Sequence, residues 1–130
     1  MAGSDIKAVF IEADVNAADN VSVAQADQPD TDFTINGTDT SGGVATFAAA
    51  RILTVTTAGS GDGTKTVTIT GTDLDGDTIT ETITLPGSAT TTSGTKYFKT
   101  VTAAEIAAAP AADVSIGHAA GAADIVFGGR

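Results

Sequence analysis

The strongest constraint on the fold is an alternation of threonine with mostly apolar residues over residues 64–85. Val67 and Ile69 alternate with threonines up to a cluster of Gly and Asp, and a second alternating run continues until Pro86-Gly87. A period of two indicates a strand with one buried face, and β-branched side chains suit such a surface. The Gly and Asp cluster supplies the turn between the runs. The segment therefore predicts a β-hairpin whose threonine faces point toward solvent.

An internal similarity predicts a second hairpin upstream. Residues 34–42 match residues 68–76 at six of nine positions, thirty-four positions apart. The match stops after the turn, which favours convergent turn chemistry over duplication. On either interpretation the turn is expected at residues 37–39, between strands that include residues 33–35 and 44–47.

The rest of the chain adds short strands and little helix. Further strands are expected at residues 6–15, 51–57, 96–102, 113–117 and 124–127. Residues 103–109 are rich in alanine but too few for more than one helical turn. Residues 16–32 are interpreted as a long loop or extended arm. The pattern predicts an all-β, antiparallel β-sandwich or barrel, with an N-terminal strand and arm over residues 1–32 and a β-domain over 33–130.

Composition and charge narrow the function classes. Ile, Leu, Val and Phe contribute 28 of 130 residues, a thin core that suits stabilisation by a partner or an oligomer. The 16 acidic and 6 basic side chains give a net charge of -10, which repels nucleic acid and anionic membranes. The sequence shows no signal-peptide pattern and no membrane-spanning run, so synthesis in the cytoplasm is expected. The absence of cysteine excludes disulfides and thiolate chemistry.

Three carboxylates alternate in the turn of the first hairpin, as at the start of a calcium loop: Asp73, Asp75 and Asp77. The full calcium-loop pattern needs a Gly after the third acidic residue and a Glu six residues beyond that Gly. Thr78 takes the place of the Gly, and neither Ile83 nor Thr84 supplies the Glu. We therefore expect a hairpin turn in which Gly76 adopts a positive φ, and no metal site.

Other candidate sites also favour structural interpretations. His118 is the only histidine and has no nucleophile motif nearby, so it is expected in a turn and without a catalytic role. The glycines of residues 59–63 and 128–129 lack the lysine and the strand-to-helix setting of a phosphate loop, and are expected to be connectors. Asn36-Gly37-Thr38 matches a glycosylation sequon, but without export it indicates a turn.

Glu81 falls on the apolar side of its strand, between Ile79 and Ile83. Burying a lone carboxylate is costly, so three arrangements compete. In order of preference, they are a cross-strand pair with Lys99 or Lys96, a bulge that turns Glu81 outward, and a face covered only on assembly.

A resemblance to a known family rests on residues 68–87 (TITGTDLDGDTITETITLPG) and 96–101 (KYFKTV). These segments resemble small virion proteins of tailed bacteriophages, most of all capsid decoration, or cement, proteins. The resemblance implies a β-rich fold on the outside of the head shell, often as a trimer that clamps neighbouring copies of the major capsid protein. It implies no catalytic, cofactor-binding or metal-binding residues.

The expected function is therefore non-enzymatic: a virion structural protein that binds the outer capsid surface and stabilises the head. A homotrimer is expected, because the core is thin and residues 16–32 are long enough to reach a neighbour. A phage tail or fibre component, or another adhesin-like β-rich binding module, is the alternative. An enzyme ranks last, because a single histidine does not provide clustered catalytic groups.

Overall fold

The computed structural model describes residues 17–25 and 32–119, and every regular element in them is a strand. The strands are β1 (Ala17–Gln25), β2 (Thr40–Ser41), β3 (Val44–Thr57), β4 (Thr66–Thr72), β5 (Thr78–Thr84), β6 (Thr91–Ile106) and β7 (Val114–His118). The expected strands at residues 6–15 and 124–127, and the glycines at 128–129, lie outside the described residues.

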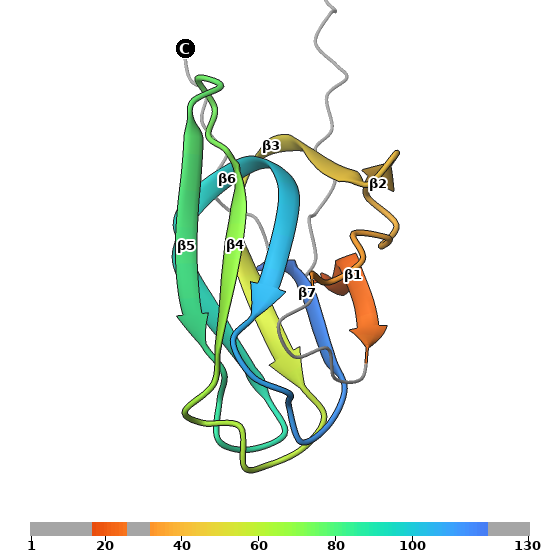
Figure 1. The fold of residues 1–130 in the computed structure, drawn as a ribbon. Helices are drawn as coiled ribbons and strands as arrows, with labels where there is room; N and C mark the ends of the chain where they lie inside the picture. Colours follow the sequence, from red (N-terminus) through yellow and green to blue (C-terminus); the bar gives the residue numbers. More distant parts are fainter. Residues whose placement is uncertain (1–16, 26–31, 120–130) are drawn as a thin grey trace, which may run out of the picture.

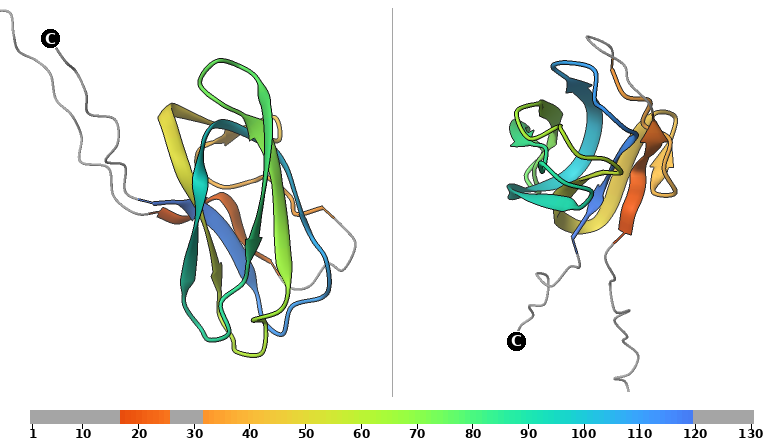
Figure 2. Two further views of the ribbon diagram at one scale, coloured as in Figure 1. Left: turned by 90° about the vertical axis from the view of Figure 1, so that its left-hand side faces the viewer. Right: turned by 90° about the horizontal axis from the view of Figure 1, so that it is seen from below.

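The strands form one antiparallel sheet in the order β1-β7-β3-β6-β4-β5, with β2 paired to β3 (Figure 1). Seen from below in Figure 2, the sheet curls around a common interior, with β4 and β5 on one side and β1 and β7 on the other. The end strands β1 and β5 are not paired with each other in this order, so the sheet stays open. The sandwich-like, all-β expectation is confirmed.

The hairpin expected over residues 64–85 is formed by β4 and β5. Its ladder runs without interruption from the pair Thr66 and Thr84 to the pair Thr72 and Thr78. The threonines of β5 are exposed, and the hydroxyls of Thr68 and Thr82 lie 3.1 Å apart across the strands. The opposite side of the hairpin lies in the core, as the alternation predicted.

A second hairpin is formed by β2 and β3, but its first strand and its turn were expected in the wrong place, since residues 33–35 belong to no strand. Ser41 pairs with Val44, so the tight turn is Gly42-Gly43, with φ of 62° and 83°. Two successive positive φ values are what a two-residue hairpin turn needs, and glycine adopts them without strain. Residues 37–39 form a separate turn that lies against β1, where Gly37 and Asp39 donate backbone N–H groups to Val21 and Asn20.

Two other expectations are wrong. Residues 17–25 do not form an arm; they are strand β1, which pairs with β7 through an irregular register. Their polar residues and shifted register hide the period-two pattern, although Val21 and Ser22 are fully buried. Residues 103–106 continue β6 and pair with β4 instead of forming a helical turn. The ladder hydrogen bonds to β4 outweigh the helix propensity of alanine.

Two long strands link the two sides of the curled sheet. Strands β3 and β6 have 14 and 16 residues and pair with each other; β3 also pairs with β7 and β2, and β6 also pairs with β4. Their side chains meet those of β4 and β7 in one core, whose largest fully buried members include Phe98, Leu53, Ile69, Leu85, Ile106 and Ile116. The strands curve at bulges, where extra residues on one strand bend it and increase its twist.

The bulge in β6 is capped by Glu81. Ile52 pairs with Tyr97 and Thr54 with Ser93, so residues 94–96 oppose one residue of β3. A carboxylate oxygen of Glu81 accepts the N–H groups of Thr95 at 2.7 Å and Lys96 at 3.2 Å, and the Thr95 hydroxyl at 2.9 Å. These N–H groups would otherwise lack the ladder partners that a regular strand provides.

This geometry corrects the ranking of the three arrangements for Glu81. The side chain points inward and is buried, but backbone amides replace the expected lysine ammonium as its partners. Lys96 instead directs its ammonium to the backbone oxygen of Thr80 at 2.7 Å. A bulge is present, but it lies on β6 and leaves Glu81 facing in. The Glu81 carboxylate leaves no room for a side chain at position 94, because a Cβ on Gly94 would lie 2.2 Å from a carboxylate oxygen of Glu81.

The bulge in β3 is capped by Lys99. Thr46 pairs with Thr100 and Arg51 with Phe98, so residues 47–50 oppose Lys99 alone. The Lys99 ammonium donates to the backbone oxygens of Phe47 and Ala48, the second at 2.8 Å. The Lys99 ammonium on β6 thus donates hydrogen bonds to carbonyl groups of β3 that lie in the bulge, outside the β3–β6 ladder.

The hydrogen bonds that Glu81 accepts at the β6 bulge should contribute substantially to the free energy of unfolding. Replacing Glu81 with Leu removes the acceptor that the N–H groups of Thr95 and Lys96 share, so the free energy of unfolding should fall by about 1–3 kcal/mol. The exposed neighbour Thr82→Ala should change it by less than about 0.5 kcal/mol. Urea unfolding measures both variants. A loss for Glu81→Leu no larger than for the control would contradict the capping role.

Candidate functional site

The described lysines are bound to oxygens of the chain, whereas many of the described carboxylates are exposed. Lys65 pairs with Asp62 at 2.9 Å, Lys96 binds the backbone oxygen of Thr80, and Lys99 caps the β3 bulge. The three described lysines are therefore engaged by oxygens of their own chain. Carboxylates on the surface include Asp32, Asp75, Asp77, Glu105 and Asp113. The outward face of this part of the molecule is consequently acidic.

Asp62 organises the loop between β3 and β4, which was expected only as a glycine connector. The residue is 0% exposed, and its carboxylate accepts from the Lys65 ammonium at 2.9 Å, the Thr57 hydroxyl at 3.0 Å and the Ala111 N–H at 2.7 Å. Desolvation works to raise its pKa, but the hydrogen bonds from Lys65, Ala111 and Thr57 and the Lys65 charge together lower the pKa. Asp62 thus ties the β3–β4 loop to the β6–β7 loop.

The lowered pKa of Asp62 predicts the direction of a pH effect. A carboxyl group whose folded pKa lies below its unfolded value stabilises the fold above about pH 4, and that contribution is lost as the pH falls through the folded pKa. Asp62→Asn should lower the free energy of unfolding at pH 7 by about 1–3 kcal/mol. The difference from wild type should shrink in acid. Asp113→Asn, an exposed control, should show neither effect; a constant difference down to pH 2 would refute the assignment.

The acidic turn between β4 and β5 is shaped by the first of its three carboxylates. One Asp73 oxygen accepts the N–H groups of Asp75 and Asp77, both at 2.9 Å, and Gly76 has the expected positive φ of 91°. The Asp73 carboxylate is therefore used within the turn. In the part of the chain that the structure describes, no group of three His, Cys, Asp or Glu residues is arranged to hold a metal.

Calcium provides a direct test of the acidic turn. If the carboxylates only shape and surround the hairpin turn, calcium at low millimolar concentration should change the melting temperature by less than about 1 °C, because it stabilises only what it binds. Thermal unfolding with and without calcium measures this, with Asp75→Ala as the control. A rise of several degrees in wild type that disappears in Asp75→Ala would establish a cation site.

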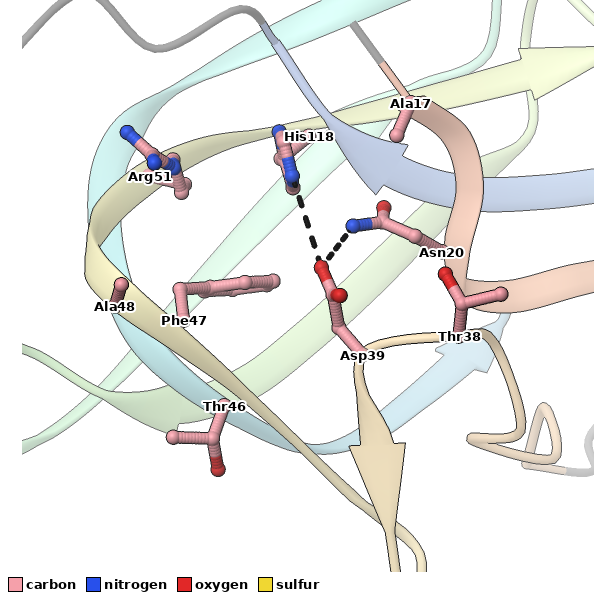
Figure 3. A pocket seen from close by; sticks show the side chains of 9 residues that line it. All are labelled: Ala17, Asn20, Thr38, Asp39, Thr46, Phe47, Ala48, Arg51 and His118. Atoms are coloured by element: carbon pink, nitrogen blue, oxygen red, sulfur yellow. Dashed lines mark hydrogen bonds and ion pairs between the residues drawn. The ribbon is translucent and has the colours of Figure 1, made fainter. Parts of the chain in front are cut away.

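A cleft of about 340 Å³ opens where β1, residues 38–39, the β3 bulge and the end of β7 meet (Figure 3). His118 is 6% exposed and turns Nε2 toward the carboxylate of Asp39, 3.7 Å away. Its ring packs edge-on against Phe47, with centroids 5.4 Å apart. Asn20 donates its amide N–H to the same Asp39 oxygen. Asp39 is thus held by side chains from two strands.

The expectation that His118 lies in a turn is wrong, and the sequence did not reveal its neighbour. The residue ends strand β7 instead of lying in a turn, and it has an acidic neighbour that is distant in sequence. Its Nδ1 lies 2.9 Å from the backbone oxygen of Ala119, which requires a hydrogen on Nδ1 for a hydrogen bond. The two ring nitrogens are thus directed at Asp39 and Ala119. The arrangement fastens the 37–39 turn to β1 and β7.

An apolar groove of about 550 Å³ lies on the other side of the β3 bulge, next to the β4–β5 turn. Its walls are Ala48 to Ala50, Leu74 and Tyr97, with Asp73 and Asp75 beside them. Leu74 is 69% exposed and Tyr97 is 48% exposed. Sequence reasoning missed this groove, although Leu74 gave a signal: it is an apolar side chain in a turn composed otherwise of Asp and Gly.

No protein-family model, no curated protein and no solved structure matches this chain. Among the described residues, no helix is long and apolar enough to cross a membrane.

Proposed function

We propose that this chain is a non-enzymatic structural protein of a tailed-phage virion, which binds the outer surface of the head and stabilises the shell. The resemblance to decoration proteins, carried by residues 68–87 and 96–101, supports this proposal. Those residues belong to the β4–β5 hairpin and to β6, which are adjacent in the sheet. The resembling segments therefore form one continuous structural unit.

The observation that carries the proposal is the distribution of charge. The described lysines are bound to oxygens of the chain itself, whereas carboxylates cover the outward face. Such a surface is repelled by DNA phosphates and has few cations to offer them. Outside a filled head, the shell and the salt screen the genome, and an acidic protein is tolerated there.

The chemistry of the described side chains also favours a binding role over catalysis. The buried ionisable groups Glu81 and Asp62 are occupied with structural hydrogen bonds, and His118 is directed at Asp39 and a backbone oxygen. The partner in this proposal is the major capsid protein. The chain acts as a homotrimer that clamps neighbouring capsid subunits, which lets a thin core draw stability from assembly.

Heads assembled without this protein provide the test. They should release their DNA at a temperature several degrees lower than complete heads, because a clamp opposes the separation of the subunits that it spans. Adding back the purified wild-type chain should restore the higher temperature, and adding an unrelated acidic protein of similar size should not. Fluorescence of a DNA-binding dye during heating measures the release.

Two outcomes of this experiment would contradict the proposal. Heads without the protein could withstand heat as well as complete heads do. The chain could also be recovered with purified tails and not with heads, which would assign it to the tail or fibre instead.

A further inference from the structure

We propose that the groove between the β3 bulge and the β4–β5 turn is the docking face of this chain. We infer that its occupant is a different protein surface, in which an apolar centre is surrounded by Lys or Arg. This inference rests on the proposed function only for the identity of that protein, the capsid subunit.

The groove concentrates the exposed apolar surface of the described residues. Among the described residues, three large apolar side chains are exposed: Leu74, Tyr97 and Val23. Two of them, Leu74 and Tyr97, line this groove, and the alanines of the β3 bulge join them. Large apolar side chains gathered in one hollow indicate an interaction site, whereas single exposed ones are ordinary.

Both walls of the groove are held in place before any partner arrives. The bulge that presents Ala48 to Ala50 is capped by the Lys99 ammonium. The turn that presents Leu74 is closed by Asp73, which accepts two N–H groups and whose own N–H donates to the backbone oxygen of Asp77 at 2.9 Å. A preorganised surface loses less conformational entropy on binding.

The charge around the groove specifies the partner. Asp73 and Asp75 line the groove, and Asp77 follows in the same turn. The Lys99 ammonium is hydrogen-bonded to the backbone oxygens of Phe47 and Ala48. A partner with cations around an apolar centre would pair with these carboxylates. A second copy of this chain, with a net charge of -10, would bring like charges to the turn. The groove therefore suits a basic-rimmed partner better than self-association.

Matched variants separate the groove from the rest of the surface. Leu74→Ser removes the apolar anchor and Asp75→Lys reverses a rim charge. Their controls make the same chemical changes elsewhere: Val23→Ser on β1, and Asp113→Lys beside the start of β7, at the end of the domain opposite the β4–β5 turn (Figure 1). All four side chains are exposed, so the variants should fold, which their melting temperatures verify.

Affinity for heads that lack the protein is the measurement, made by co-sedimentation at several salt concentrations. Leu74→Ser should weaken binding about tenfold or more, as expected for a buried anchor. Asp75→Lys should weaken it at low salt and reduce the salt dependence, because it removes an attraction that ions screen. Both controls should bind within about twofold of wild type.

The outcomes distinguish the two proposals. If wild type binds and the groove variants bind as the controls do, the docking face is wrong and the capsid function stands. An equal loss in groove variants and controls would also overturn the docking face. If wild type does not bind the heads, the function fails, and the inference about its partner fails with it.

Discussion

The architecture depends on charged side chains that satisfy the backbone at two bulges. Strands β3 and β6 curve between the two sides of the sheet, and each bulge withdraws peptide groups from the ladder. Glu81 accepts from N–H groups of the β6 bulge, and Lys99 donates to carbonyls of the β3 bulge. The anionic side chain thus caps N–H donors, and the cationic side chain caps carbonyl acceptors. A small apolar inventory can thus enclose one core, because the sheet folds over on itself.

The sequence predicted what depends on neighbours in the chain and missed what depends on distant strands. The β4–β5 hairpin follows from local alternation and its turn residues. The alternation put Glu81 on the apolar side of its strand and left three arrangements open, because its partners depend on a bulge in β6 that alternation does not reveal. Strand β1 was missed because an irregular register with β7 interrupts its pattern. Residues 103–106 have alanine-rich helix propensity, and pairing with β4 overrides it.

The candidate sites also divide into those formed by residues close in the sequence, which were predicted, and those formed by distant segments, which were not. Asp73 was predicted as a turn residue, and its contacts span only four residues. His118 and Asp39 are far apart in the sequence, and they meet because β7 pairs with β1 and β3, to which Asp39 is hydrogen-bonded. The groove joins a bulge of β3 to the β4–β5 turn and to Tyr97, so no single segment encodes it. The β3 bulge borders both the cleft and the groove, since Ala48 lines each of them.

The proposed role assigns different tasks to the inside and the outside of one small domain. Its described lysines and the buried carboxylates of Glu81 and Asp62 hold the fold together, and its exposed carboxylates and the apolar groove are left for a partner. Electron cryomicroscopy of complete heads tests this account most directly. It should reveal the domain on the outer surface, three copies around a local three-fold position, each with the β4–β5 turn against the shell. Density inside the shell or on the tail, or a domain whose β4–β5 turn points into solvent, would contradict it.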